Sequence, residues 1–228
     1  MRALPGKATR STVVAAPVTR GTVVEAQRRR ILRAAAELIA KRGYGDISVE
    51  LIVKRGRVSF KTFYAHFPNK EACFLEFFDE AFAAYEATLA EALADAADRP
   101  WAERVLAILA AFLADVAADP IVARACLVEA PTAGPEVLAR YEQAVRAFAP
   151  IFAEGRELTP VGARLPATLE ETLAGSILWS VYQRLIVGEV GEIERLLPAA
   201  GELVLRPYLG EAEARRLAGG FSALAPAG

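Results

Sequence analysis

Histidine, cysteine and methionine are scarce in this sequence, and their scarcity excludes several kinds of site. The 228 residues include one histidine, two cysteines and one methionine. His66 stands alone, so no histidine cluster can bind a metal. Cys73 and Cys126 lie 53 residues apart, which fits no metal-ligand spacing and gives no reason to expect a disulfide framework. We therefore expect no metal, no cofactor and a reducing, cytoplasmic environment.

Long apolar runs and a secretory signal are also missing. Although 54% of the residues are apolar, no uninterrupted run approaches the ~18 residues of a membrane span. Residues 1–20 carry scattered basic side chains, two prolines and a glycine, but no central apolar block of the kind that signals have. We expect no membrane-spanning segment, and we interpret residues 1–21 as a flexible basic arm.

Lysine is absent after residue 70, and charge is divided along the chain accordingly. Residues 1–70 hold 15 lysines and arginines against 4 acids, whereas residues 71–228 hold 12 against 24. The total net charge of −1 therefore hides a basic first third and an acidic remainder. This division points to a polyanionic partner for the first part only. A solvated basic face without a partner is the alternative interpretation.

The sequence pattern predicts helices throughout and no strand. The first helix is expected over residues 22–42 and ends at Gly43. Ser48, Ser59 and Asn69 are placed to cap the helices that follow, because their side chains can accept hydrogen bonds from free backbone N–H groups. Further helices are predicted at 69–97, 100–118, 120–130, 134–154, 167–188, 191–208 and 211–219, with a loop over 155–166.

The stretch from Val58 to Glu71 is the most informative part of the chain. A short helix beginning at Ser59 has polar and basic groups at its N-terminal end and aromatic groups within it. A second helix opens at Asn69, with Lys70 beside its start. Proteins bind DNA in this way when one helix enters a groove and the start of the next lies at a phosphate.

A set of residues between positions 25 and 75 has the spacing of a known family signature. The set is Gly43-Tyr44, Ser48-Val49, Ile52, Val58-Ser59, Thr62-Phe63-Tyr64, His66-Phe67 and Lys70-Glu71. With these residues the chain resembles the tetracycline-repressor (TetR) family of transcriptional regulators. The resemblance implies an all-α homodimer: a three-helix helix-turn-helix DNA-binding domain over 22–68 and an all-helical effector-binding and dimerisation domain over 69–228.

Two residues depart from the family pattern. Arg57 stands at the turn position where the family usually has glycine, which can take a positive φ without steric cost. Arginine there implies either a strained backbone or a slightly different turn, and the side chain can gain a phosphate contact. Val53, where the family commonly has alanine, needs slightly more room between helices.

Candidate DNA contacts gather around the second and third helices. Lys70 is the best phosphate ligand, because the helix N-terminus adds free N–H groups and partial positive charge to its ammonium. Lys61 is expected to contact a base or a phosphate, with plain solvation as the alternative. The resemblance implies that the Thr62 and Tyr64 hydroxyls meet phosphate, although Tyr64 can also sit half-buried. The candidates are Ser48, Arg57, Ser59, Phe60, Lys61, Thr62, Tyr64, His66 and Lys70.

Phe60 has two opposed interpretations. Phe60, Phe63, Tyr64 and Phe67 recur at helical spacing, which is typical of one buried stripe. The family resemblance instead places Phe63 and Phe67 in the core and turns Phe60 toward DNA, where it could pack on a thymine methyl. His66 is either a structural residue or a phosphate ligand. Arg10, Arg20 and Arg28 to Arg30 can reach the minor groove or backbone, or remain solvated.

Residues after 70 supply candidates for an effector pocket and a dimer interface. The predicted pocket residues are Phe78, Phe82, Tyr85, Phe112, Cys126, Tyr141, Phe148, Trp179, Tyr182 and Gln183. The predicted dimer residues are Leu169, Leu173, Ile177, Val181, Leu197, Ala200 and Val204, which form apolar stripes on the last two long helices. Packing within the core of a single chain is the alternative for both sets. The apolar composition favours a hydrophobic or aromatic effector.

These observations favour a DNA-binding transcriptional regulator. We hypothesise a repressor that leaves its double-stranded DNA operator when a small apolar or aromatic ligand binds. A ligand-independent DNA-binding or interaction protein is the alternative. An enzyme is the least supported reading, because the sequence has no nucleotide-binding glycine motif, paired catalytic carboxylates or nucleophile–base constellation.

Overall fold

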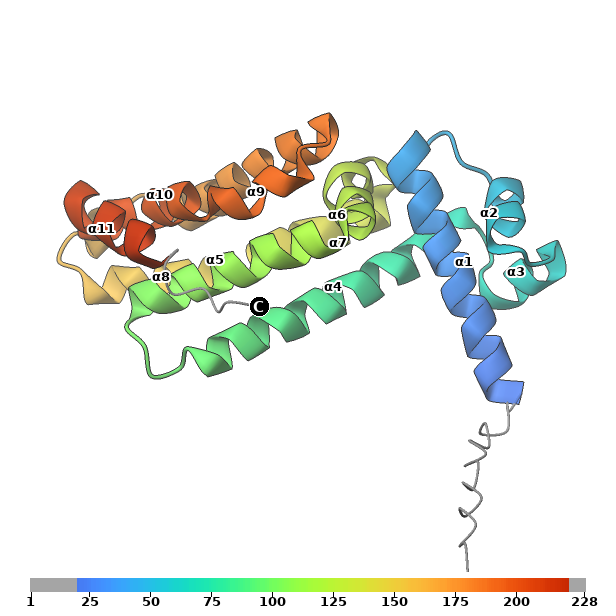
Figure 1. Ribbon diagram of the computed structural model, residues 1–228, viewed down its shortest axis with the longest axis horizontal. Helices are drawn as coiled ribbons and strands as arrows, with labels where there is room; N and C mark the ends of the chain where they lie inside the picture. The colour runs from blue at the N-terminus through green and yellow to red at the C-terminus, as the bar shows by residue number, and fades with distance from the viewer. Residues whose placement is uncertain (1–19, 222–228) are drawn as a thin grey trace, which may run out of the picture.

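The computed structural model describes residues 20–221, and within that range every regular element is a helix. Figure 1 shows a small group of three helices at one end of an elongated helical bundle. The predicted all-α class is therefore confirmed. Most of the predicted arm, residues 1–19, lies outside the described residues, as does Arg10.

The small group consists of α1 (Arg20–Arg42), α2 (Val49–Gly56) and α3 (Phe60–His66). The predicted caps are present. The Ser48 hydroxyl accepts a hydrogen bond from the Leu51 N–H at 3.3 Å, and the Ser59 hydroxyl accepts one from the Thr62 N–H at 3.0 Å. These bonds satisfy N–H groups that the first helical turn leaves free, and so fix where α2 and α3 begin.

Two long helices connect this group to the far end of the molecule. Helix α4 (Lys70–Asp95) begins beside α3 and runs the length of the bundle, and α5 (Trp101–Ala118) returns alongside it (Figure 1). The Asn69 side chain caps α4 by accepting the Ala72 N–H at 2.7 Å. Helix α4 therefore packs in both parts of the molecule.

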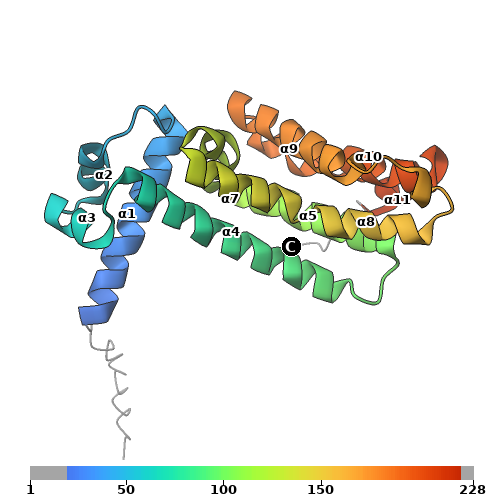
Figure 2. The same cartoon turned by 180° about the vertical axis from the view of Figure 1, so that it is seen from behind.

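The remaining helices complete the bundle, as the reverse view in Figure 2 shows. They are α6 (Pro120–Arg124), the π-helical η1 (Ala125–Glu129), the short η2 (Ala130–Thr132), α7 (Pro135–Arg146), α8 (Ala149–Leu158), η3 (Gly162–Arg164), α9 (Leu169–Val187), η4 (Val190–Glu192), η5 (Glu194–Leu196), α10 (Leu197–Leu209) and α11 (Glu211–Phe221). Within residues 20–221, no single helix is long and apolar enough to cross a membrane.

Two apolar clusters form the core. One joins α1–α3 to the first half of α4 and to α7, and includes Ile39, Phe63 and Phe74. The other fills the bundle between α5, α8, α9, α10 and α11. The first cluster crosses from α3 into α4, so the predicted domains share apolar packing there, and the boundary after residue 68 stays a prediction.

Several predicted helix limits were wrong. The helix predicted at 134–154 is two helices, because Pro150 lacks an N–H and cannot continue α7 into α8. The loop predicted at 155–166 begins later, because α8 continues through Gly155 to Leu158. A Cβ at Gly155 would lie 2.5 Å from the Trp101 ring, so this glycine permits close packing and does not mark a loop.

Candidate DNA interface and ligand cavity

The turn between α2 and α3 has the positive φ at Arg57 that the sequence analysis considered. Arg57 takes φ 51° and ψ 47°, the left-handed conformation, and it is the only non-glycine residue with positive φ in the described chain. This conformation costs an L-residue roughly 1–2 kcal/mol that glycine avoids. Of the two expectations for Arg57, the strained backbone is the one present.

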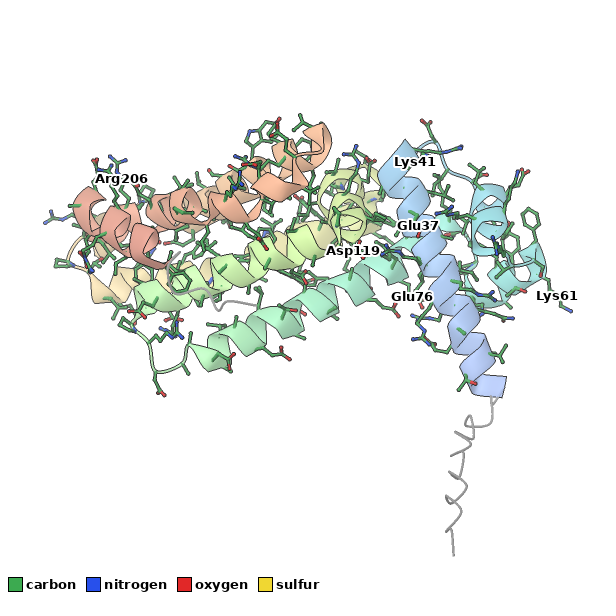
Figure 3. All side chains as sticks on the ribbon, in the orientation of Figure 1. Glu37, Lys41, Lys61, Glu76, Asp119 and Arg206 are labelled. Atoms are coloured by element: carbon green, nitrogen blue, oxygen red, sulfur yellow. The ribbon has the colours of Figure 1, made fainter. Side chains whose placement is uncertain are left out.

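The outward face of α3 carries an aromatic and basic surface. Phe63 and Phe67 are buried, at 0% and 1% exposure, whereas Phe60 is 50% and Tyr64 55% exposed. The single buried stripe was therefore the wrong interpretation of this spacing, because the short helix has only one face against the core. Lys61 is also exposed, and Figure 3 shows its side chain directed away from the bundle.

Lys70 is held against the protein itself. Its ammonium donates hydrogen bonds to the Tyr44 and Ile47 carbonyl oxygens, both at 3.0 Å, and lies 4.3 Å from the Tyr44 ring centroid. The lysine thereby fastens the loop between α1 and α2 to the start of α4. One of its three N–H bonds stays free for a phosphate.

The remaining candidates lie on or near the same surface. Ser48, Arg57 and Ser59 are exposed, while Thr62 and His66 are partly exposed. The Thr62 hydroxyl lies 2.9 Å from that of Ser59, so the two share a hydrogen bond at the start of α3. Contact of these residues with DNA stays a prediction.

The arginines of α1 divide between the bundle and solvent. Arg28 pairs with Glu76 and Glu80 of α4, and Arg33 pairs with Asp119 at 2.6 Å. Figure 3 shows Glu76 and Asp119 lying beside α1. The suggestion that Arg28 reaches DNA is therefore not supported, because its guanidinium forms ion pairs with two glutamates of α4. Arg29 and Arg30 are exposed.

A cavity of about 430 Å³ lies in the bundle, between α4, α5, α6, η1 and α7. Its walls are mostly apolar and aromatic. Seven of the ten predicted pocket residues line it: Phe78, Phe82, Tyr85, Phe112, Cys126, Tyr141 and Phe148. Tyr85, Phe112 and Phe148 form a ring cluster with centroids 5.5–5.8 Å apart.

The other three predicted pocket residues do not line this cavity. Trp179 is 60% exposed and stacks on Tyr182 with ring centroids 5.3 Å apart, and Gln183 is exposed beside them. Their helical spacing resembles that of a pocket wall, but it places them on the outer face of α9. Which face of α9 is buried is decided by its packing against the other helices of the bundle.

The cavity also has polar walls that the sequence analysis did not identify. Glu80, Asp115 and Asp119 line it. A signal for two of them was present on α5, where Phe112, Asp115, Val116 and Asp119 share one helical face at i, i+3, i+4 and i+7. The Asp119 side chain also caps α6, accepting the Val122 N–H at 3.1 Å.

Burial changes the chemistry of several groups in the cavity wall. It raises the pKa of the Cys126 thiol to about 12, so the thiol stays protonated and unreactive at neutral pH. Partial burial, together with the charge of Asp119, raises the pKa of Asp115. For Asp119 burial acts in the same direction, but hydrogen bonds from Arg33 and from the Val122 and Ile121 N–H groups, with the charge of Arg33, together outweigh it and lower the pKa.

The predicted dimer residues lie mainly inside the protomer. Leu173, Ile177, Val181, Leu197, Ala200 and Val204 are each at most 8% exposed and belong to the bundle core, and Leu169 is partly buried against it. A side chain already buried in its own chain has little surface to offer a second copy. The exposed apolar surface of these helices is a different set: Trp179, Ile186, Val187 and Leu203, at 42–62% exposure.

Besides the Arg28–Glu80 pair, three polar contacts connect the cavity region to the three-helix group. The first is the Arg33–Asp119 pair. In the second, Arg124 of α6 donates to the Ala40 carbonyl oxygen of α1 at 2.7 Å and to that of Leu185 in α9 at 2.8 Å. In the third, Glu129 of η1 accepts the Tyr44 N–H at 3.2 Å.

Comparison with known proteins agrees with this arrangement. The family model described as bacterial regulatory proteins, tetR family, matches residues 31–77, which cover most of α1–α3 and the first part of α4. No curated protein matched the sequence.

Solved structures share the fold over most of the chain. The fatty acid degradation regulator FadR from Bacillus halodurans superposes with a TM-score of 0.67 at 18% identity, over 82% of this chain and 96% of its own. FadR from Bacillus subtilis, solved with stearoyl-CoA, gives 0.62 at 18%, over 80% and 98%. A γ-butyrolactone receptor (ArpA-like protein) gives 0.63 at 19%, over 89% and 99%. The chain thus matches the tetR family model over residues 31–77 and shares the fold of these solved regulators over most of its length.

Proposed function

We propose that the protein is a repressor that binds operator DNA as a dimer and is released by a small, largely apolar molecule. The observation that carries this proposal is the position of the cavity. It lies along α4, the helix whose N-terminus is fastened to the DNA-binding group through Lys70. A ligand that displaces α4 therefore acts on both parts of the molecule.

The DNA surface in this proposal is the outward face of α3. Lys61, Phe60 and Tyr64 are exposed there, and α3 rests on a rigid base of buried phenylalanines. In helix-turn-helix proteins the second helix of the motif enters the major groove, and a dimer places two such helices about 34 Å apart. One seven-residue helix alone reads few bases, so a dimer supplies the specificity.

The dimer surface in this proposal is the outer face of α9 with the neighbouring part of α10. Trp179, Ile186, Val187 and Leu203 expose apolar surface there. We expect a second copy of the chain to cover this surface. In a two-fold symmetric dimer the same apolar patch of each copy meets its counterpart, and this contact sets the distance between the two identical recognition helices.

The ligand in this proposal occupies the 430 Å³ cavity, whose aromatic walls suit an apolar molecule. The relatives support a ligand site in this fold, since the Bacillus subtilis FadR was solved in complex with stearoyl-CoA and another relative is a γ-butyrolactone receptor.

DNA retardation with a selected operator tests the proposal. The wild type should bind, and hydrophobic compounds that bind the protein should release the DNA. Lys61→Ala should lower affinity and, if Lys61 reads a base, cost about 1–3 kcal/mol at that base. The melting temperature should not change, because Lys61 is exposed and makes no hydrogen bond or ion pair with residues 20–221. Unaltered DNA affinity in Lys61→Ala would place the DNA surface elsewhere.

A further inference from the structure

The charge of the cavity wall limits the ligands that fit. Three carboxylates line the cavity, and no lysine, arginine or histidine does so in the described part of the chain. Glu80 is paired with Arg28, and Asp119 is paired with Arg33. Asp115 is exposed at the edge of the cavity and has no ion-pair partner among residues 20–221. The wall therefore carries one uncompensated negative charge next to apolar and aromatic surface.

The Tyr85 hydroxyl is the second unsatisfied group. Its oxygen is buried and has no hydrogen-bond partner among the described residues. A buried hydroxyl without a hydrogen-bond partner destabilises the folded protein. Its ring belongs to the cluster with Phe112 and Phe148. Both Tyr85 and Asp115 line the cavity, and burial together with the charge of Asp115 raises the pKa of this phenol.

We propose that the cavity takes an apolar molecule that carries one protonated amine, held by the Asp115 carboxylate and the Tyr85 hydroxyl. The ammonium N–H groups donate to both oxygens, which satisfies the hydroxyl and compensates the carboxylate. The faces of the surrounding aromatic rings attract the same cation. The apolar body of the ligand fills the remaining space between the phenylalanines. The inference rests on the proposed ligand site and specifies its chemistry.

Other head groups suit this wall less well. A carboxylate or phosphate would meet Asp115 without a neighbouring cation in the cavity wall, and the two like charges would repel each other. A neutral alcohol can accept a hydrogen bond from Tyr85 but leaves the charge of Asp115 uncompensated. The expected order of affinity is therefore amine, then alcohol, then carboxylate.

Three probes with one chain length test this order. Decylamine, decan-1-ol and decanoate are titrated into the protein at pH 7 by calorimetry, below their micelle concentrations. Decylamine is protonated at this pH and should bind at least tenfold more tightly than decanoate. Equal or tighter binding of decanoate, or no binding of decylamine, overturns the proposal.

Three variants locate the amine. Asp115→Asn should weaken decylamine about tenfold, the loss of one ion pair at 1.4 kcal/mol per tenfold, and leave decan-1-ol unchanged. Tyr85→Phe removes only the hydroxyl and should weaken decylamine by a smaller factor. Asp98→Asn is the control, because it removes the same charge from an exposed acid that does not line the cavity. If Asp98→Asn weakens decylamine as much as Asp115→Asn, overall charge is responsible and the proposal is wrong.

DNA retardation with the same probes separates this inference from the proposed function. Decylamine that binds through Asp115 but leaves DNA affinity unchanged would support the amine site and contradict the regulatory function. DNA release by decanoate or decan-1-ol, without binding of decylamine, would support the regulatory function and contradict the amine site.

Discussion

At the scale of single residues, Arg57 and Glu170 each have a feature that by itself would destabilise the folded protein. Arg57 adopts a left-handed backbone in a turn where glycine would be relaxed. Glu170 is the one buried charged residue among those described, at 6% exposure. It accepts hydrogen bonds from Arg156 at 2.7 Å and from the Tyr208 hydroxyl at 2.6 Å.

Arg57→Gly should stabilise the protein. Relief of the positive φ is worth about 1 kcal/mol, after the greater freedom of glycine in the unfolded chain is subtracted. The melting temperature should rise by about 2–4 °C, measured by calorimetry. Arg57→Ala is the matched control, because it also removes the charge but keeps a Cβ. Equal melting temperatures for the two variants would show that the turn is not strained.

Glu170 should make stability depend on acid pH. Burial alone would raise its pKa, but hydrogen bonds from Arg156 and Tyr208 outweigh this and hold the pKa below the ordinary 4.5. The charged form is thus favoured in the folded state. Its contribution is complete above pH 4.5 and is lost as the pH falls through the lowered folded value.

Glu170→Gln removes this contribution. At pH 7 the melting temperature should fall by several degrees, because Arg156 and Tyr208 lose a charged acceptor. The gap between wild type and variant should narrow below pH 4.5. Glu171→Gln, an exposed neighbour on the same helix, serves as the control. A gap that is constant from pH 7 to pH 3 would mean that the charge of Glu170 contributes nothing.

At the scale of elements, α9 illustrates how one helix can serve two surfaces. Its inner face, with Leu173, Ile177 and Val181, belongs to the bundle core. Its outer face carries Trp179 stacked on Tyr182, followed by Ile186. Charged substitutions on the inner face would unfold the chain, so they cannot test dimerisation.

Trp179→Glu tests the proposed dimer surface. The side chain is 60% exposed in the protomer, so the fold should tolerate the change, whereas a charge inside an apolar interface should cost several kcal/mol. Sedimentation should report a monomer with unchanged helical content, and operator affinity should fall. Leu158→Glu is the control, since Leu158 is 62% exposed but lies on α8. A Trp179→Glu variant that remains dimeric would move the interface away from α9.

At the scale of the whole molecule, the cavity and the DNA-binding group are joined by a shared apolar cluster and by several polar contacts. Arg33 reaches from α1 to Asp119, which both lines the cavity and caps α6. If the cavity takes the proposed cationic ligand, we expect its charge to compete with Arg33 for Asp119 and to weaken the contact between α1 and the bundle. The same contact therefore offers a route by which ligand binding changes DNA affinity.

Arg33→Gln tests this route. The variant should keep the cavity, and therefore bind ligand, but the ratio of DNA affinities without and with ligand should shrink. A tenfold ratio corresponds to about 1.4 kcal/mol of coupling, and DNA must weaken ligand binding by the same factor. Arg29→Gln is the control, because it removes an equal charge from α1 at a residue that pairs with Glu25 of the same helix, at 3.7 Å. An unchanged ratio in Arg33→Gln would assign the coupling to other contacts.

Local signals in the sequence were sufficient for the starting points of α2, α3 and α4. Ser48, Ser59 and Asn69 cap helices because each accepts a hydrogen bond from an N–H only three residues away. The helix break at Pro150 was equally local, and the sequence contained the reason for it. The family resemblance rested on residues within one short segment, and the same segment is the one that the tetR family model matches.

The sequence by itself determined the all-helical fold, the basic N-terminal third and the DNA-binding signature, because these depend on neighbours along the chain. Tertiary structure decided which face of each helix is buried. It placed Ile177 in the core and Trp179 outside, and it brought Asp115 of α5 to the same cavity as Tyr85 of α4. Helical periodicity shows that residues share a face, but the direction of that face is set by packing against helices distant in sequence.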